Sequence, residues 1–323
     1  MINYWQQING QFVLRSKAEL QNNEPVWVDA RNVTNVDASL LETSCAIDFE
    51  DISDILDPDE LSRIEDCDTY VLMIVRVPLY DANAEVSFYT IPLGIILEGN
   101  AIITICASNE SLLEEISSGK IKGVNLNDFS SFIIKILSRS DTLFLHYLKE
   151  INRQTTVMQR ELQNPIENKE IVKLLNAQKS LEYFTTSLSS NQLFLQKLRR
   201  TKLIALDEDD FDWLDDVEID NRQARGMAET YANILDSLMA TFTSIISNNL
   251  NVSMKRLTVI NLILMVPTLI TSFFGMNVPL PFAHQKWIGM IAIIILCVLT
   301  TIGTALLLRG NESMKNSFNR RRS

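Results

Sequence analysis

Glycine and proline are scarce in this sequence, which has ten glycines and eight prolines among 323 residues. Their combined share is about half of the roughly 12% that is usual in proteins. This scarcity favours long regular elements, mainly helices. It also excludes collagen-like and low-complexity disordered classes.

Histidine is also rare, and the cysteines show no pairing pattern. His146 and His284 are the two histidines, and the four cysteines show no CxxC spacing. A disulfide framework and a soft-metal site are therefore not expected, and the cysteines indicate a reducing compartment. The sequence has no GxxxxGK phosphate loop and no defensible pair of nucleophile and base. We therefore predict that the chain is not an enzyme and uses no organic cofactor.

Acidic residues are concentrated in two segments. The formal net charge is −11, from 29 basic and 40 acidic residues. Residues 37–68, the first acidic segment, contain twelve acids and one base; residues 207–220, the second acidic segment, contain nine acids and no base. Binding of phosphates requires clustered Lys and Arg. Nucleic acid is therefore excluded as a partner, and divalent cations are expected instead.

Two long uncharged runs follow the second acidic segment. No Lys, Arg, Asp or Glu occurs between Arg256 and Lys286. Residues 257–274 and 287–308 are each long enough to cross a hydrocarbon layer about 30 Å thick as a helix; two buried helices of a soluble protein are the alternative. Because basic residues flank the pair of runs, we expect a two-span protein of the cell membrane with both termini in the cytoplasm. Residues 275–286 would then form an outer loop, and residues 309–323 a basic cytoplasmic tail.

Residues 1–128 have the pattern of a cytoplasmic α/β domain. Strands are expected where Val, Ile, Tyr and Phe gather between turn-forming residues, and short helices are expected among them. The expected strands are residues 25–29, 70–78, 85–97 and 101–107, and the expected helices are residues 38–43 and 49–56.

A helical hairpin is expected over residues 129–210, with helices at 129–162 and 167–200. Asn164-Pro165 separates them, because the residue before a proline is disfavoured in a helix.

A long stalk helix is expected to begin near Asp210 or Asp212 and to occupy residues 211–274, so that it continues into the first span. From residue 212 onward its length would be about 95 Å. Its apolar residues recur in alternating steps of four and three, which indicates packing against partner helices. This seam comprises Val217, Asn221, Ala224, Ala228, Tyr231, Leu235, Leu238, Phe242 and Ile245.

A polar stripe follows one face of the first span. At 100° per residue, seven residues lie within a sector of about 100°, and Pro267 points away from them. Either these side chains hold transmembrane helices together, or a symmetric ring of identical helices uses them to line a water-filled path. Without a carboxylate, such a path would suit Mg²⁺, which keeps its water. The stripe comprises Asn251, Met254, Thr258, Asn261, Met265, Thr268 and Ser272.

A short motif follows the first span directly. Gly275-Met276-Asn277 lies between the two spans, after Ser247-Asn248-Asn249-Leu250-Asn251 and Pro267-Thr268. This arrangement resembles the CorA family of divalent-cation transport proteins, and the resemblance covers the whole chain.

The resemblance implies a funnel-shaped homopentamer with an α+β cytoplasmic domain, a long helical stalk and two transmembrane helices in each chain. Its implied activity is uptake of Mg²⁺, driven by the membrane potential. Gly275, Met276 and Asn277 would form the selectivity filter, where Asn277 oxygens bind the hydrated ion. The implied pore positions are Asn251, Met254, Leu257, Met265 and Thr268, with Met254 and Leu257 at a hydrophobic constriction.

The resemblance also implies that intracellular Mg²⁺ closes the pore by binding between neighbouring cytoplasmic domains. Acids of both segments are our candidates for this regulatory site, and a solvated acidic surface is the alternative for each. The candidates are Asp48, Asp51 and Asp54 in the first segment, and Asp209, Asp212, Asp215 and Asp216 in the second.

Two other functions stay open at this point. One is a zinc, cobalt or nickel transporter of the same superfamily. The other is a membrane-anchored coiled-coil adaptor that transports nothing, which would explain the spans and the seam but not the polar stripe.

Overall fold

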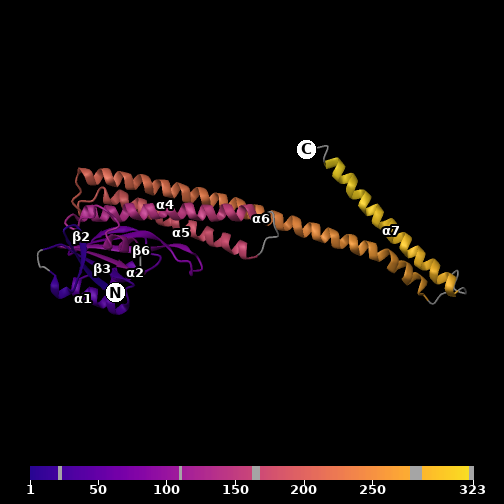
Figure 1. The fold of residues 1–323 in the computed structure, drawn as a ribbon, viewed down its shortest axis with the longest axis horizontal. Coiled ribbons are helices and arrows are strands. Elements are labelled where there is room, and N and C mark those ends of the chain that lie inside the picture. The colour runs from indigo at the N-terminus through magenta and orange to yellow at the C-terminus, as the bar shows by residue number, and fades with distance from the viewer. Residues whose placement is uncertain (21–23, 109–110, 162–167, 277–285, 320–323) are drawn as a thin grey trace. The chain divides into compact units, whose positions relative to one another are not determined.

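The computed structural model describes residues 1–20, 24–108, 111–161, 168–276 and 286–319. The chain divides into two compact units, residues 1–239 (the N-terminal unit) and residues 240–323 (the C-terminal unit). Helix α6 (Glu208–Phe274) contributes residues to both units. Figure 1 shows the elements along the chain.

The described residues of the N-terminal unit form a seven-stranded sheet in the order β2-β1-β3-β7-β6-β5-β4. Neighbouring strands are antiparallel except for β3 and β7, which are parallel. The strands are β1 (Ile2–Ile8), β2 (Gln11–Arg15), β3 (Val26–Arg31), β4 (Arg63–Asp66), β5 (Val71–Tyr80), β6 (Phe88–Glu98) and β7 (Ala101–Cys106).

The central strands are apolar on both faces because helices cover both sides of the sheet. Helices α1 (Asn35–Cys45) and α2 (Phe49–Leu56) lie on one side (Figure 1). Leu41, Ile52 and Ile55 pack there against Leu72 and Ile74 of β5 and their neighbours. The packing is tight: a Cβ added at Gly94 would lie 2.5 Å from Ile55 Cδ1.

The other face carries a short helix, α3 (Ser111–Ser117), and the long helices. The long helices are α4 (Phe129–Glu161), α5 (Asn168–Leu198) and the first part of α6. Phe132, Phe194 and Leu214 of these helices share one buried cluster with Trp27 of β3. Trp27 Nε1 donates a hydrogen bond of 2.9 Å to Thr104 Oγ1, which satisfies its polar atom inside the core.

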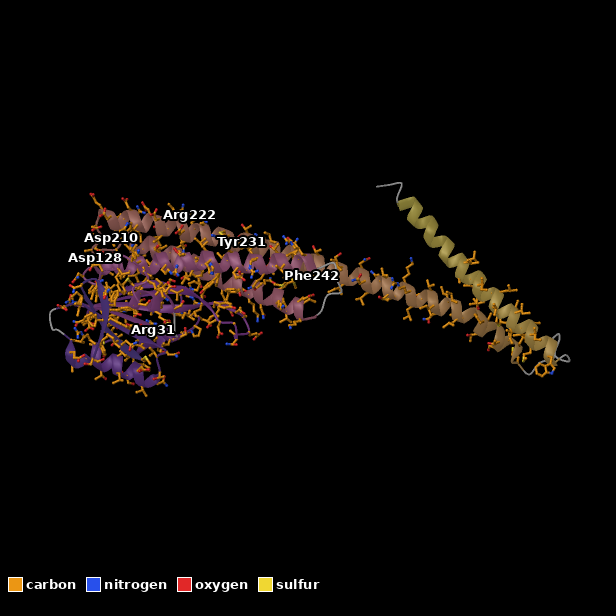
Figure 2. The ribbon with its side chains drawn as sticks, viewed as in Figure 1. Arg31, Asp128, Asp210, Arg222, Tyr231 and Phe242 are labelled. Atoms are coloured by element: carbon orange, nitrogen blue, oxygen red, sulfur yellow. The ribbon has the colours of Figure 1, made fainter. Side chains whose placement is uncertain are left out.

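Aspartates cap the starts of two long helices, as Figure 2 shows for Asp128 and Asp210. Asp128 Oδ1 accepts from the Ser131 backbone N–H at 3.2 Å. At the start of α6, the Asp207 and Asp210 side chains each accept from the other's backbone N–H, at 2.8 and 3.2 Å. Such reciprocal bonds satisfy donors that the first turn of a helix leaves free. Some of the acids in the second acidic segment therefore define where α6 begins, two residues before the earlier of the two expected positions.

The predicted seam of α6 is confirmed. Val217, Asn221, Ala224, Ala228, Leu235, Leu238 and Phe242 are buried, and Tyr231 and Ile245 are half-buried. The expected long helices and the four expected strands are also present, with ends displaced by up to three residues.

Five elements in the described residues were not expected from the sequence: β1, β2, β4, α3 and the short 3₁₀ helix η1 (Lys17–Glu19). β1 and β2 are joined by Asn9-Gly10, whose φ angles are 51° and 80°, as a two-residue hairpin turn requires. The polar character of residues 1–12 concealed this hairpin, although Asn-Gly is itself a strong hairpin signal.

The C-terminal unit contains the rest of α6 and helix α7 (Lys286–Asn319). Two stretches in the described residues are long and apolar enough to cross a membrane, one within α6 and one at Met290–Leu307. The backbone of α7 continues beyond residue 308, where the second span was expected to end.

Candidate ion pathway and cation-binding residues

The expected pore-lining residues lie on an exposed face of α6. All eight are exposed in the single chain: Asn251, Met254, Leu257, Thr258, Asn261, Met265, Thr268 and Ser272. The half-buried residues of the same stretch are Val259, Ile263, Val266, Pro267, Ile270 and Phe274. At 100° per residue, the centres of the two sets lie about half a turn apart. The covered face of α6 is therefore not the face that carries the polar stripe.

Helix α7 has a matching half-buried face that includes Ile293, Cys297, Thr300, Thr301 and Thr304. Near the C-terminal end of α6 the two helices run side by side (Figure 1). An open depression there is lined by Asn261, Met265, Thr268, Ser272 and Met276 of the α6 side together with Leu296 of α7. The stripe thus borders open space along its length rather than being sealed by α7.

The polar atoms of the stripe differ in what they can offer an ion. Thr258 Oγ1 and Thr268 Oγ1 donate to the carbonyl oxygens of Met254 and Leu264, at 2.8 and 2.7 Å. Such bonds satisfy a hydroxyl donor within the helix and leave the oxygen lone pairs as acceptors. The hydroxyls can therefore accept from water that an ion retains.

Three large apolar side chains among these pore candidates are Met254, Leu257 and Met265, whose relative exposures are 65%, 60% and 61%. Met254 and Leu257 lie about one turn apart. Their side chains would form an apolar ring if copies of α6 surrounded a common axis.

The predicted filter lies just beyond the end of α6. The Gly275 N–H donates to Thr271 O at 2.9 Å, and a Cβ at this position would lie 3.2 Å from the same oxygen. Glycine therefore allows the backbone to close tightly on the last turn. Met276 is exposed, and Asn277 lies outside the described residues.

The three candidates of the first acidic segment are placed around α2, in different environments. Asp48 immediately precedes the helix. Asp54 is paired with Arg63 at 2.8 Å. Asp51 accepts a hydrogen bond of 2.5 Å from the Tyr70 hydroxyl, which raises the Tyr70 pKa in addition to the larger effect of burial.

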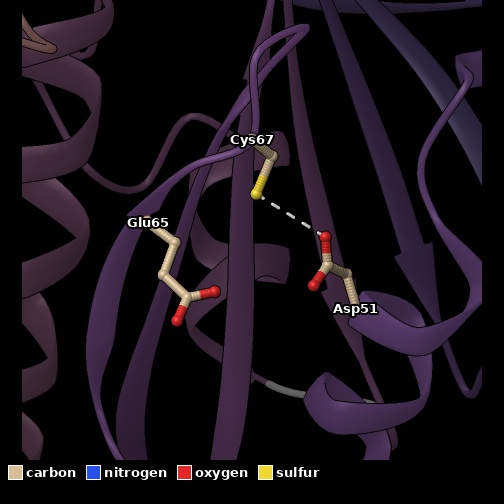
Figure 3. A group of neighbouring side chains, drawn as sticks. All are labelled: Asp51, Glu65 and Cys67. Carbon is tan, nitrogen blue, oxygen red and sulfur yellow. Dashed lines mark hydrogen bonds between the residues drawn. The ribbon is translucent and has the colours of Figure 1, made fainter.

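Figure 3 shows Asp51 together with Glu65 and Cys67. One ligand atom from each lies within 4.8 Å of the others, so the three could hold a metal ion. The Cys67 thiol lies 3.7 Å from Asp51 Oδ2. Burial, followed by the negative charge of Asp51, raises the Cys67 pKa to about 11. Glu65 also contacts Arg63 at 3.3 Å.

The sequence analysis did not predict Glu65 or Cys67 as neighbours of Asp51. A search for short ligand spacings cannot find this group, because α2 and β4 bring the residues together across the fold. The acid-rich composition around Cys67 was the available signal.

In the second acidic segment, Asp209, Asp212 and Asp216 are exposed and Asp215 is half-buried. Asp215 pairs with Arg199. Of the remaining three candidates, Asp209 lies in the first turn of α6, where the positive end of the helix dipole favours a carboxylate without any metal. Asp212 and Asp216 lie further along the helix.

The candidates on α2 and those at the start of α6 lie on opposite faces of the sheet. Helix α2 packs on the face of the sheet that carries Ile52 and Ile55 in its cluster. The start of α6 packs on the opposite face through Leu214 and Val217. A cation site that uses both the α2 candidates and the start of α6 would therefore need residues from two copies of the chain.

Comparison with known sequences gives one family over most of the chain. Residues 22–310 match the sequence model of a family described as CorA-like Mg²⁺ transporter protein. The cobalt/magnesium transport protein CorA of Methanocaldococcus jannaschii is 26% identical over 282 residues, which cover 85% of this chain and 88% of that protein. The protein of the same name from Thermotoga maritima is 21% identical over 258 residues, which cover 78% and 72%.

Comparison with solved structures gives the same fold. The complete structure of the CorA magnesium transporter from Methanocaldococcus jannaschii matches with a TM-score of 0.76 at 23% identity, over 96% of this chain and 97% of that chain. The expected fold class, an α/β unit followed by a long helix and two candidate membrane helices, is therefore confirmed.

Proposed function

The chain belongs to the CorA family of Mg²⁺ transporter proteins, and from this premise we propose that it is a homopentameric channel for uptake of Mg²⁺ and related divalent cations. It is a membrane protein with two spans, and its family consists of transporters rather than enzymes. The observation that carries the proposal is the exposed, carboxylate-free polar stripe on the membrane-spanning part of α6.

Copies of α6 around a common axis would turn this stripe into the wall of a pore. Polar groups at membrane depth need partners or water. The stripe offers amides, hydroxyls and thioethers, which contact the water around an ion more readily than they replace it. Mg²⁺ loses its water reluctantly, so this wall suits a hydrated Mg²⁺ ion.

Selection would occur at Gly275, Met276 and Asn277. In this proposal Gly275 and Met276 shape the turn, and Asn277 contributes backbone and side-chain oxygens at the outer mouth. A ring of amide oxygens binds the hydrated ion weakly enough for it to leave, as conduction requires. Asn277→Ala should abolish selective Mg²⁺ uptake and leave assembly intact, which flux and size measurements on one preparation would test.

Gating would combine an apolar constriction with the acidic segments. Rings of Met254 and Leu257 would exclude water from the closed pore. Mg²⁺ held between neighbouring chains would offset repulsion among carboxylates, and its loss would let the subunits separate. The separation of α2 from the start of α6 by the sheet supports a site that is shared between chains.

The proposed driving force is the membrane potential, with both termini in the cytoplasm. At 100 mV a divalent ion gains about 2 × 2.3 = 4.6 kcal/mol on entry. This energy would suffice for uptake without ATP.

The test uses the purified full chain in liposomes that contain a Mg²⁺-sensitive dye and carry an inside-negative K⁺ diffusion potential. We expect external Mg²⁺ to raise the dye signal and the signal to scale with the potential. A non-transporting adaptor would give no flux. A zinc-selective relative would transport Zn²⁺ with no competition from Mg²⁺.

A matched pair of cysteine variants tests the pore wall directly, in a chain whose native Cys297 is replaced by serine. Asn261 and Ile260 are adjacent, at the same depth and both exposed, but they point 100° apart. A charged, water-soluble thiol reagent should modify Asn261→Cys and block the flux, and should leave Ile260→Cys unmodified. Equal reactivity of the two variants would contradict the proposed pathway.

A further inference from the structure

A carboxyl group is buried between two helices of the N-terminal unit. Asp141 of α4 has a relative exposure of 3%, and Asn221 of α6, the polar member of the seam, has 1%. Asn221 Nδ2 donates a hydrogen bond of 3.3 Å to Asp141 Oδ1. This contact is separate from the ion pathway and from the acidic residues considered above as cation ligands.

The surroundings of Asp141 do not suit a negative charge. The small cavity at this contact is lined by Leu137, Ser140, Asp141, Asn191, Leu195, Val217 and Asn221, a set without Lys, Arg or His. Its volume of about 10 Å³ leaves room for at most one water molecule. An ionised carboxylate here would have one N–H donor and no cation, whereas buried charges in proteins are normally paired.

The amide oxygen of Asn221 also lacks a hydrogen-bond donor among the described residues. Asn221 Oδ1 is buried and, among the described residues, has no hydrogen-bond partner, and Ser140 Oγ is in the same condition. A carboxyl that keeps its proton has a hydroxyl to donate and a carbonyl oxygen to accept. A neutral acid facing an amide can therefore satisfy both groups, which an ionised acid cannot do.

Two of the three effects on the pKa of Asp141 favour the neutral carboxyl. Burial raises the pKa of Asp141 well above its ordinary value; the hydrogen bond from Asn221 lowers the pKa, and the nearby carboxylate of Asp220 on α6 raises it. Helix α5 contributes the neutral residues Asn191 and Leu195 to the cavity. The buried Arg76 guanidinium of β5 donates to Ser187, Thr90 and the carbonyl oxygens of Pro58 and Glu60 instead.

We propose that Asp141 keeps its proton at neutral pH and donates it to Asn221 Oδ1, forming a reciprocal acid–amide pair that joins α4 to α6 and opens when the proton is lost to water. The device is a proton-binding site at a helix contact. Because α6 also carries the polar stripe, release of this contact would alter how the N-terminal unit holds that helix. This last consequence rests on the proposed function.

The sign of the pH effect follows from the raised pKa. The folded chain holds a proton that the unfolded chain releases near the ordinary aspartate value of about 3.9. Stability from this site is therefore complete below that value and falls as pH rises toward the raised folded pKa. The fall approaches a factor of about ten in the folding equilibrium constant per pH unit within that interval.

Infrared difference spectroscopy on the full chain in detergent tests the protonation state. We expect a carbonyl band of a protonated carboxyl at neutral pH, lost in Asp141→Asn and kept in Asp220→Asn, the matched control. The double variant Asp141→Asn with Asn221→Asp exchanges acid and amide and should regain the band. A wild-type spectrum without the band, or a band that survives Asp141→Asn, would overturn the proposal, and a swapped variant without it would overturn the reciprocal pair.

Thermal unfolding gives a second readout. Asp141→Asn keeps a neutral pair, so its melting temperature should fall less between about pH 4 and 7 than that of the wild type, as about a tenfold change per pH unit implies while the unfolded chain has released the proton and the folded chain keeps it. Equal pH profiles would contradict the proposal. Failure of Mg²⁺ flux in the wild type would refute the proposed function alone, because the infrared band and the unfolding profile do not depend on transport.

Discussion

Arg76 offers the sharpest test of how the first acidic segment is held in place. Its side chain on β5 is 7% exposed, and its five N–H donors reach neutral oxygens. The acceptors are Ser187 Oγ, the carbonyl oxygens of Pro58 and Glu60, and the carbonyl and Oγ1 of Thr90, at 2.5–3.2 Å. Arg76 thereby fixes the backbone that follows α2 to strands β5 and β6 of the sheet.

Arg76→Lys keeps the charge and leaves three donors for five acceptors. Two buried acceptors therefore lose their donor, at about 1–3 kcal/mol each. Because Thr90 Oγ1 and Ser187 Oγ lie 2.8 Å apart and can bond each other, we take the lower part of this range, about 2–4 kcal/mol in total. In a unit of this size, each kcal/mol of lost stability lowers the melting temperature by about 2–4 °C. We therefore expect Arg76→Lys to melt about 4–16 °C below the wild type.

The assay is thermal unfolding of the full chain in detergent, followed by tryptophan fluorescence, with Arg222→Lys as the control. Arg222 is an exposed arginine of α6, labelled in Figure 2. Hydrogen exchange should also become faster in the loop at residues 57–62 in Arg76→Lys and stay unchanged in the control. A melting temperature for Arg76→Lys within about 2 °C of the wild type would correspond to a stability loss below about 1 kcal/mol. Such a result would refute the assigned role.

Three further predictions concern other parts of the molecule. Gly94→Ala should lower stability by about 1–3 kcal/mol through overpacking, because its Cβ would lie 2.5 Å from Ile55. Adding Ile55→Ala to the same chain should recover part of that loss. Additive losses of the two substitutions in a denaturant titration would contradict this. Alkylation of Cys67 should speed up about tenfold per pH unit up to its pKa of about 11, as mass spectrometry of the modified peptide would show, whereas a plateau near pH 9 would disprove the raised pKa. Replacing the four candidate aspartates of the second acidic segment with asparagine should weaken inhibition of flux by internal Mg²⁺, and unchanged inhibition would remove that segment from the sensor.

Helical periodicity carried most of the correct predictions. The seam from Val217 to Phe242 has the alternating spacing of a helix that packs along its length, and its residues are buried except Tyr231, which is half-buried. The polar stripe was located by the same counting, and its residues are exposed. Such patterns are local, so they survive without knowledge of the rest of the fold.

Contacts between segments that are far apart in the sequence could not be predicted from local patterns. The strand β4 has four residues, three of them charged, and is defined by its pairing with β5 rather than by its own composition. The group of Asp51, Glu65 and Cys67 depends on the same pairing. The burial of Asp141 likewise depends on which face of α4 meets α6, whereas a polar residue in a helix is ordinarily exposed.

The division of the chain after Met239 has a consequence for biosynthesis. The whole sheet and the helices that cover it are encoded before residue 257, where the first uncharged run begins. The parallel pair of β3 and β7 can form once residue 106 has left the ribosome, and α4 and α5 can then cover the sheet. Because domains fold as units during synthesis, the earlier one first, the nascent chain can complete this unit before its first hydrophobic helix is available to the insertion machinery.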